Sequence, residues 1–306
     1  MLHVSTAELV KSAAAGKDDK HHYIPVFYSK RWAGPDGRLC EFSRPYDVVK
    51  PRRTHPDGTG FVRGLYTLPN APPGKEHIIE THLMGSVDSW AAVAHSRMLE
   101  KGTSIGRLEA RQALGWCQFL YSLIVRNPEH LKVIGQKLAE MTPEILESVR
   151  DEYDSIRGPN DPPTFDEYKA KFRNKPLSVP PARVLPNILG SRQVVRALAT
   201  LKWITRGVPN TRFPLLTSDR PVIMTNGLDR SDAHIVLPIS PKMLFIAAKE
   251  QQMLHQLASM NADELVHRAN EKVAEQAYTY VYGTDDSQLR FVAKRLGKRV
   301  RSSPLG

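Results

Sequence analysis

Histidine and acidic residues in three short stretches of the chain are suited to acid–base or metal chemistry. His21 and His22 are adjacent, His77 and Glu80 are three residues apart, and Asp219 lies between two predicted strands. On a helix, His77 and Glu80 face one site, whereas successive side chains of a strand point in opposite directions. Imidazole and carboxylate groups serve as general bases and as ligands of divalent metals. We therefore take His21, His22, Glu80 and Asp219 as candidate catalytic residues, with Glu80 and Asp219 as candidate metal ligands.

Each of these residues also has a structural interpretation, which the sequence leaves open. Glu80 is flanked by apolar residues, and a partly buried carboxylate must be paired or protonated. Its partner could be Lys30, Arg220, a histidine or a metal ion. Asp219 could instead accept backbone N–H groups in a turn. In the catalytic interpretation, Lys30 would hold a phosphate group.

The positive charge of the chain is concentrated in two segments. The 306 residues include 43 Lys and Arg against 32 Asp and Glu, a net charge of +11. Tyr168 to Ser218 holds ten bases and no acid, and Arg290 to Arg301 holds six bases and no acid. This distribution favours a polyanion such as nucleic acid as the partner, although a basic tail could also serve only solubility.

A helix predicted in the first basic segment places four bases around an aromatic ring. At 100° per residue, the bases cover an arc of roughly 120° and Trp203 lies inside it; the bases are Arg192, Arg196, Lys202 and Arg206. An aromatic side chain among cations is suited to stacking on a base while the cations contact phosphates. The alternative is a surface helix whose bases pair with acids elsewhere and whose Trp203 packs under a neighbouring segment.

The elements that must position these residues change in type along the chain. Residues 21–75 predict a short helix at 26–32 and strands at 38–43, 46–50 and 60–68. Residues 76–207 are mainly helical, with an almost wholly apolar central helix at 108–125. Strands follow at 212–216, 221–225, 234–238 and 242–248, then a helix at 261–282. The sequence predicts an α+β fold with a helical middle and short strands at both ends: a flexible arm at 1–20, a single domain at 21–289 and a basic tail at 290–306.

Several motifs resemble those of a known bacterial family. The opening motif is His21-His22-Tyr23-Ile24-Pro25-Val26-Phe27-Tyr28. Later motifs are Glu80 followed by Asp88, Thr217-Ser218-Asp219, Leu237-Pro238-Ile239-Ser240-Pro241 and Asn270. Together they resemble the family catalogued as domain of unknown function 4238, over nearly the whole chain. The resemblance implies candidate positions but no particular activity.

Composition excludes several classes of protein. No apolar run approaches the ~18–20 residues that span a bilayer, and the first residues lack the pattern of a signal peptide. Two cysteines are too few for a disulfide framework or a thiolate zinc site, so we expect a cytoplasmic protein. The phosphate-binding, dinucleotide-binding and hydrolase-elbow motifs are absent from the sequence.

Two principal functions remain. The first is a cytoplasmic, nuclease-like hydrolase acting on nucleic acid, with a divalent metal as a candidate cofactor that offsets charge on phosphate oxygens. The second is a non-enzymatic module that binds nucleic acid or protein and whose His, Glu and Asp residues form a buried polar network. An enzyme acting on a small anionic substrate is a third interpretation.

Overall fold

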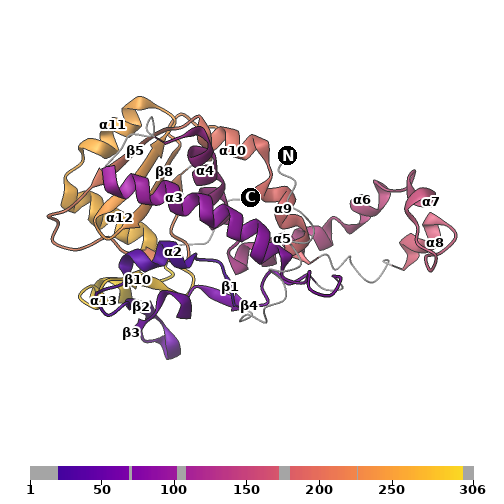
Figure 1. Ribbon diagram of the computed structural model, residues 1–306, viewed down its shortest axis with the longest axis horizontal. Helices are drawn as coiled ribbons and strands as arrows, with labels where there is room; N and C mark the ends of the chain where they lie inside the picture. The colour runs from indigo at the N-terminus through magenta and orange to yellow at the C-terminus, as the bar shows by residue number, and fades with distance from the viewer. Residues whose placement is uncertain (1–19, 69–70, 102–107, 172–179, 226, 299–306) are drawn as a thin grey trace.

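A four-stranded antiparallel sheet with helices on both faces forms the centre of the fold (Figure 1). The computed structural model describes residues 20–68, 71–101, 108–171, 180–225 and 227–298. The strands of this sheet lie in the order β5 (Lys202–Gly207), β9 (Met243–Ala248), β8 (His234–Ser240) and β7 (Ile223–Thr225).

The two central strands are apolar along their length because both of their faces are covered. Ile235 and Leu237 of β8 belong to the core formed with α3 (Gly85–Lys101) and α4 (Ala110–Val125). Val236, between them, belongs to the core formed with α11 (Gln251–Ser259) and α12 (Ala262–Gln276). Successive residues of a strand point to opposite faces, so this alternation produces three layers.

Two smaller sheets contain the strands from the beginning of the chain, and one of them also contains strands from its end. Strand β1 (Lys20–His22) pairs with β4 (Phe61–Arg63). The second sheet has the order β3 (Lys50–Thr54), β2 (Leu39–Ser43), β10 (Val281–Gly283) and β6 (Thr217–Ser218). The short helices α2 (Val26–Ser29) and η1 (Lys30–Trp32) follow β1, and the 3₁₀ turns η2 (Pro45–Asp47) and η3 (Pro56–Gly58) flank β3.

The helical middle of the chain packs beside these sheets. A π-helical turn, η4 (Ile79–Met84), leads directly into α3, and α5 (Pro128–Glu140) follows α4. Asn127 caps α5 by accepting the N–H of Glu129, as the Asn-Pro-Glu sequence indicates. Helices α9 (Pro181–Leu189) and α10 (Arg192–Ala199) pack against α5 and α4, and α13 (Leu289–Ala293) follows β10. In the described part of the chain, no helix combines the length and apolar character needed to cross a membrane.

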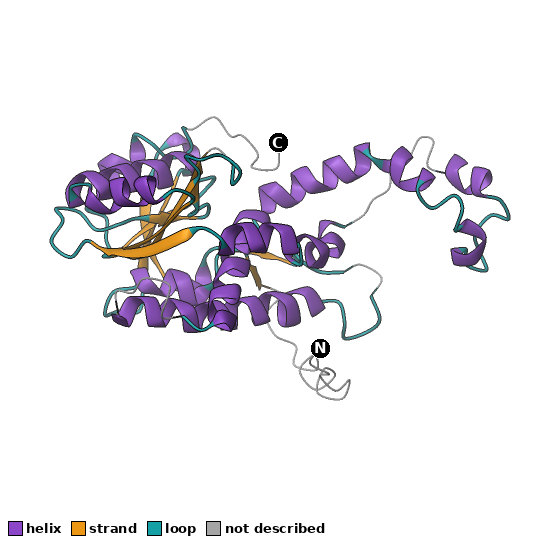
Figure 2. Ribbon diagram, turned by 90° about the horizontal axis from the view of Figure 1, so that it is seen from above, coloured by secondary structure: helices purple, strands orange, loops and turns teal. Residues whose placement is uncertain are grey.

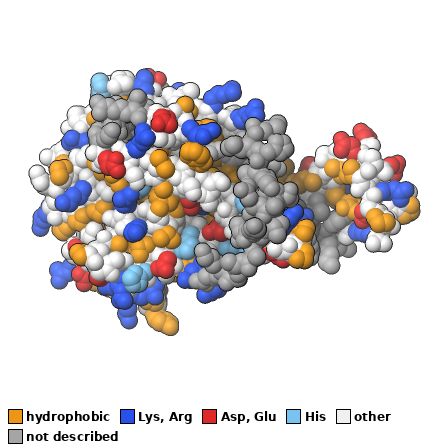
Figure 3. All heavy atoms as spheres, in the orientation of Figure 1, with side chains coloured by type: hydrophobic (Ala, Val, Ile, Leu, Met, Phe, Trp, Pro, Cys, Tyr) orange, Lys and Arg blue, Asp and Glu red, His pale blue; other side chains and the backbone are white. Residues whose placement is uncertain are grey.

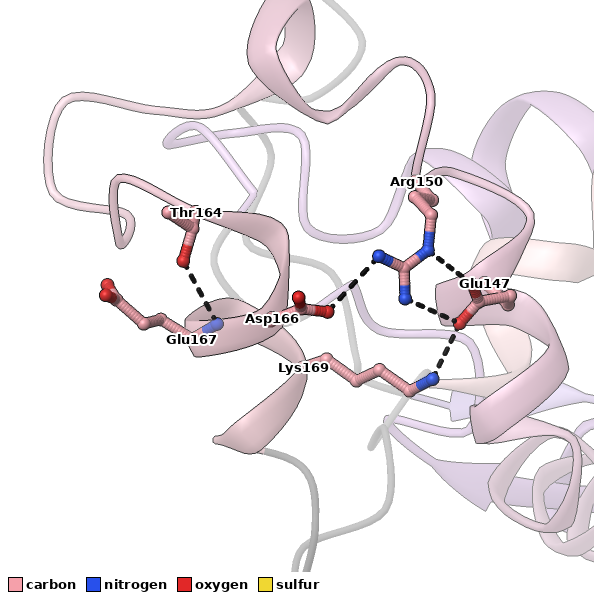
Figure 4. Close-up of polar contacts among 6 residues, drawn as sticks. All are labelled: Glu147, Arg150, Thr164, Asp166, Glu167 and Lys169. Carbon is pink, nitrogen blue, oxygen red and sulfur yellow. Dashed lines mark hydrogen bonds and ion pairs between the residues drawn. The ribbon is translucent and has the colours of Figure 1, made fainter.

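Three short helices project from the body of the molecule (Figures 1 and 2). They are α6 (Thr142–Glu147), α7 (Tyr153–Ile156) and α8 (Phe165–Ala170), and they share a small core of Leu146, Tyr153 and Phe165. Figure 4 shows the ion pairs beside that core: Arg150 contacts Glu147 and Asp166, and Lys169 Nζ lies 2.6 Å from Glu147 Oε2. Exposed pairs of this kind add little stability, so the apolar contacts hold this projection together.

The predicted α+β class, with a helical middle and strands at both ends, is confirmed. The strand predicted at 212–216 is wrong, because the strand β6 covers only Thr217–Ser218. The strand predicted at 46–50 is wrong, because residues 45–47 form the turn η2 and the strand begins at Lys50. The helix predicted at 261–282 ends at Gln276, and residues 281–283 form β10 instead. The folded chain also continues past residue 289, since Val292 and Leu296 are buried in the second core. Residues 1–19 and 299–306 of the predicted arm and tail lie outside the described residues.

Candidate functional site

The opening motif is held by hydrogen bonds from its aromatic side chains to distant segments. The Tyr28 hydroxyl donates to the carbonyl of Pro238 at 2.7 Å and lies 2.7 Å from Thr217 Oγ1. The Trp32 indole donates to the carbonyl of Leu215 at 2.7 Å. These partners lie in or beside the two later motifs, so the motifs meet in one part of the fold.

His21 is buried between a backbone N–H and a second histidine. The Tyr66 N–H donates to His21 Nδ1 at 2.7 Å, and His21 Nε2 lies 3.1 Å from His77 Nδ1. Because Nδ1 accepts a hydrogen bond, the proton of a neutral His21 ring is on Nε2, which donates to His77. The ring also stacks on Tyr66, with centroids 5.5 Å apart. Both nitrogens of His21 are thus engaged.

Glu80 is the predicted site residue with the most unusual environment. The His22 backbone N–H donates to Glu80 Oε1 at 3.2 Å, whereas the buried Oε2 has no hydrogen-bond partner among the described residues. Burial raises the pKa of this carboxyl to about 7, although the His22 N–H and the Arg126 charge both lower it. Glu80 therefore titrates near neutral pH, as a general acid or base would.

A fully buried arginine lies near Glu80. Arg126 follows the last residue of α4, and its Nη1 donates to Asp88 Oδ1 at 3.0 Å. Its Nε and Nη2 have no hydrogen-bond partner in the described ranges. Burial raises the pKa of Asp88 while Arg126 lowers it. Burial lowers the pKa of His22, and the Arg126 charge lowers it further. Arg126 thus acts electrostatically on three acid–base groups of the site.

Asp219 ties three segments of the chain together. Its carboxylate accepts the backbone N–H groups of Tyr278, Thr279 and Tyr280 at 2.8, 2.5 and 3.0 Å, and its backbone carbonyl accepts from Asn127 Nδ2 at 2.9 Å. Burial raises the pKa of Asp219 to about 6, while each of the three N–H groups lowers it. Both carboxylate oxygens are occupied, which matches the backbone-binding interpretation of this residue.

A pocket of about 210 Å³ opens where these three segments meet. Four of its ten lining residues are aromatic, and three others lie at the start of α5. Its lining residues are Tyr23, Phe61, Val62, Asn127, Pro128, Glu129, Asp219, Tyr278, Thr279 and Tyr280. Two predicted motif positions, Tyr23 and Asp219, therefore line one cavity.

The structure unites some of the predicted catalytic residues and separates others. His21, His22 and Glu80 lie together through the contacts described above. Lys30 is exposed on η1, and no contact joins it to Glu80 within the described residues. Nor does a contact join Glu80 to Asp219 there, and no group of three or more His, Cys, Asp or Glu residues in those ranges is arranged to hold a metal ion.

The predicted basic helix at 192–206 is wrong. Helix α10 ends at Ala199, and Lys202–Gly207 forms strand β5, which pairs with β9. Trp203 is 5% exposed, its indole donates to the Leu198 carbonyl at 3.1 Å, and its ring packs on Phe245. Trp203 is thus unavailable for stacking on a base. Arg192, Arg196 and Lys202 are exposed, whereas the Nε of the half-buried Arg206 is enclosed.

Sequence reasoning missed Arg126 and the residues that line the pocket. Arg126 does carry a signal, because it is a charge at the end of a nearly all-apolar helix and is followed by the Asn-Pro helix start. The types and spacing of Asn127 and Glu129 indicate only a helix start. Phe61, Tyr278 and Tyr280 are scattered aromatics with no distinguishing spacing.

The fold and these contacts define an α+β protein whose short motifs converge on a buried polar centre beside a small pocket. The model of the family described as a protein of unknown function, DUF4238, matches residues 20–287, and the chain belongs to that family. No curated protein and no solved structure matches the chain significantly.

Proposed function

We propose that this chain is a cytoplasmic module that binds nucleic acid without cleaving it. The observation that carries the proposal is a cluster of exposed cations, here called the basic edge, formed by Arg44, Lys50 and Lys294. Lys50 pairs across the sheet with Ser43, which precedes Arg44, and Arg44 Nη2 donates to the carbonyl of Ala293 at 3.3 Å. Within the described ranges, none of the three cations has an acidic partner.

The surroundings of the basic edge support a polyanionic ligand. Figure 3 shows Lys and Arg side chains gathered at the lower left of the molecule, over β2 and β3. Arg52 and Arg53 lie on the same exposed strand, although each pairs with an acid. Cations brought together from distant parts of a chain attract phosphates and release counterions on binding.

The role of the polar motif residues supports binding over catalysis. The nitrogens of His21 and the carboxylate oxygens of Asp219 are engaged in hydrogen bonds that connect segments. This is the buried polar network that a binding module would use to fix its surface. The buried cysteines Cys40 and Cys117 are unpaired, which supports a reducing compartment such as the cytoplasm.

Removal of the basic edge should weaken the salt dependence of nucleic-acid binding. In the variant Arg44→Gln/Lys50→Gln/Lys294→Gln, the log–log slope of affinity against salt should flatten by about 2–3 units, since each lost phosphate contact removes ~0.7–0.9. Fluorescence anisotropy with single- and double-stranded oligonucleotides at several salt concentrations measures this slope.

The matched control removes three positive charges from another part of the surface. Arg192→Gln/Arg196→Gln/Lys202→Gln acts on α10 and β5, which lie away from β3 and α13 (Figure 1). If the control flattens the slope and the basic-edge variant does not, nucleic acid binds at Arg192, Arg196 and Lys202, as the sequence predicted. If the wild-type chain binds neither type of oligonucleotide, the proposed function is wrong.

A second candidate function, the nuclease-like hydrolase, is favoured by one observation. Glu80 has a pKa of about 7 and an unpartnered oxygen among the described residues, beside the Arg126 charge. In that mechanism Glu80 would accept a proton from an attacking water, and the arginine would offset charge developing on a phosphate oxygen. The hydrolase candidate still includes a divalent ion. Glu80 and Asp219 would not bind that ion as a pair, because the structure does not bring them together.

Metal analysis and a cleavage assay separate the two candidates. For the binding module, we expect purified protein with no stoichiometric divalent ion, and oligonucleotides that remain intact with Mg²⁺, Mn²⁺ or Zn²⁺ added. Cleavage that disappears in Glu80→Gln while oligonucleotide binding persists would instead establish the hydrolase. The expected ratio of cleavage rates between wild type and Glu80→Gln would then be about 10²–10⁴ for a general base.

A further inference from the structure

The pocket beside Asp219 has walls suited to a flat ring. Tyr23, Phe61, Tyr278 and Tyr280 contribute aromatic side chains, and Pro128 adds an apolar surface. Base–aromatic stacking tolerates any base because every base has a π-face. The volume of about 210 Å³ is below the ~300–1,000 Å³ of typical small-molecule sites, so the pocket fits one ring system and not a whole nucleotide.

The polar groups of the pocket include one acceptor that the fold does not use. Asn127 Oδ1 accepts from Glu129 N, and its Nδ2 donates to the backbone carbonyl of Asp219. The Asp219 carboxylate accepts three backbone N–H groups. The Glu129 carboxylate makes no hydrogen bond or ion pair with the described residues. Burial and the neighbouring Asp219 raise the pKa of Tyr23, which keeps its hydroxyl protonated as a donor. Two of the residues that line the pocket thus carry a carboxylate acceptor, on Glu129, and a hydroxyl donor, on Tyr23.

Cations lie around the pocket and not among its lining residues. Lys20 Nζ is 5.2 Å from the centroid of the Phe61 ring. The Arg52 charge lowers the pKa of Tyr280, in opposition to burial, which raises it. Arg52 is on β3, the strand that also carries Lys50 of the basic edge. A phosphate attached to a ring in the pocket would therefore lie near Lys20 or Arg52.

We propose that this pocket binds a single nucleobase that carries an exocyclic amino group, with cytosine as the preferred form. The Glu129 carboxylate would accept from the amino group, as Asp and Glu do from cytosine N4, and Tyr23 would donate to a ring acceptor. A uracil in the same pose would present a carbonyl oxygen to the carboxylate. The inference rests on the proposed function, because the base would belong to a strand held by the basic edge.

Binding of free nucleotides tests the pocket directly. NMR titration and calorimetry of the full chain with CMP, UMP and inorganic phosphate should give saturable CMP binding, at least about fivefold tighter than UMP. In Glu129→Gln, the affinities for CMP and UMP should become equal within about twofold, because the amide can donate to uracil. Glu129→Gln conserves the shape of the side chain, so the test does not depend on a variant that fails to fold.

A second variant tests the aromatic wall. Phe61→Ala should weaken CMP binding about 5- to 150-fold by removing stacking. Tyr46→Ala, at an aromatic side chain that is 95% exposed and outside the pocket, should leave CMP binding unchanged.

The outcomes separate this inference from the proposed function. Absence of CMP binding, phosphate binding as tight as CMP, or CMP binding unaltered by both pocket variants would overturn the inference. Oligonucleotide binding with a basic-edge salt slope would then still support the proposed function. CMP binding that needs Glu129 and Phe61, in a chain that binds no oligonucleotide, would support the pocket and overturn the proposed function.

Discussion

Replacing Asp219 by alanine should lower the free energy of unfolding by about 3–5 kcal/mol. The substitution leaves three part-buried backbone N–H groups, those of residues 278–280, without their acceptor. A hydrogen bond to a charged group contributes about 1.5–3 kcal/mol, and an unsatisfied buried donor costs about 1–3 kcal/mol. The expected loss is smaller than the contribution of three complete hydrogen bonds, because alanine also removes the cost of burying a carboxylate. That cost is evident from the pKa of Asp219, which burial raises to about 6. Urea unfolding measures the difference.

Two further variants test whether the loss of stability in Asp219→Ala comes from its lost hydrogen bonds. Asp219→Asn keeps one acceptor oxygen but turns an NH₂ group toward backbone donors, so it should fall between wild type and alanine. Asp151→Ala removes an exposed acid and should change stability by less than about 0.5 kcal/mol. A loss below about 1 kcal/mol in Asp219→Ala would contradict an anchoring role and would return Asp219 to the list of catalytic candidates.

Short stretches of sequence were enough to predict the elements that are buried along an unbroken apolar run or that begin with a capping motif. The central helix α4 is nearly all apolar because it is enclosed, and the Asn-Pro-Glu start of α5 is a local capping signal. Strands β8 and β9 were recognisable from their short apolar runs between turn signals. In each case the information lies within about fifteen residues.

Trp203 illustrates why a local pattern was insufficient. Residues 192–206 have apolar positions that satisfy a helical period, yet their second half pairs with β9, about forty residues later. The gain from inserting Trp203 between Leu198 and Phe245 outweighs the local preference, and that gain depends on tertiary contacts. The spacing of 100° per residue therefore placed Trp203, which is a core residue, on the basic face of a predicted surface helix.

The partners of the candidate site residues were unpredictable for a different reason. Glu80 and Asp219 are bound by backbone N–H groups, those of His22 and of residues 278–280. Almost every residue carries such a group, so residue type gives no sign of which N–H will be used. The sequence predicted that Glu80 needs a partner, but the fold alone decides that His22 N–H and the charge of Arg126 are near it.

The Glu80→Gln variant should be more stable than wild type at pH 8 by about 2–3 kcal/mol and equal to it within about 0.5 kcal/mol at pH 4. Burial raises the folded-state pKa of Glu80 from 4.5 to about 7. As pH rises through this window, the unfolded chain loses its proton before the folded chain does, so wild-type stability falls and the loss is complete above pH 7. Each pKa unit corresponds to 1.36 kcal/mol, which sets the upper end of the expected gain. Glutamine has no charge to bury and can still accept the His22 N–H.

The difference between the two unfolding profiles isolates Glu80 from other groups that titrate in the same range. Asp219, with a pKa of about 6, contributes equally to wild type and to Glu80→Gln, so its effect cancels when unfolding is measured from pH 4 to 8. Glu80→Gln less stable than wild type at pH 8 would mean that the ionised carboxylate is paired with Arg126 in solution. That pairing would satisfy Glu80 Oε2 and a guanidinium nitrogen together, and it would remove the neutral-pH titration on which the hydrolase candidate depends.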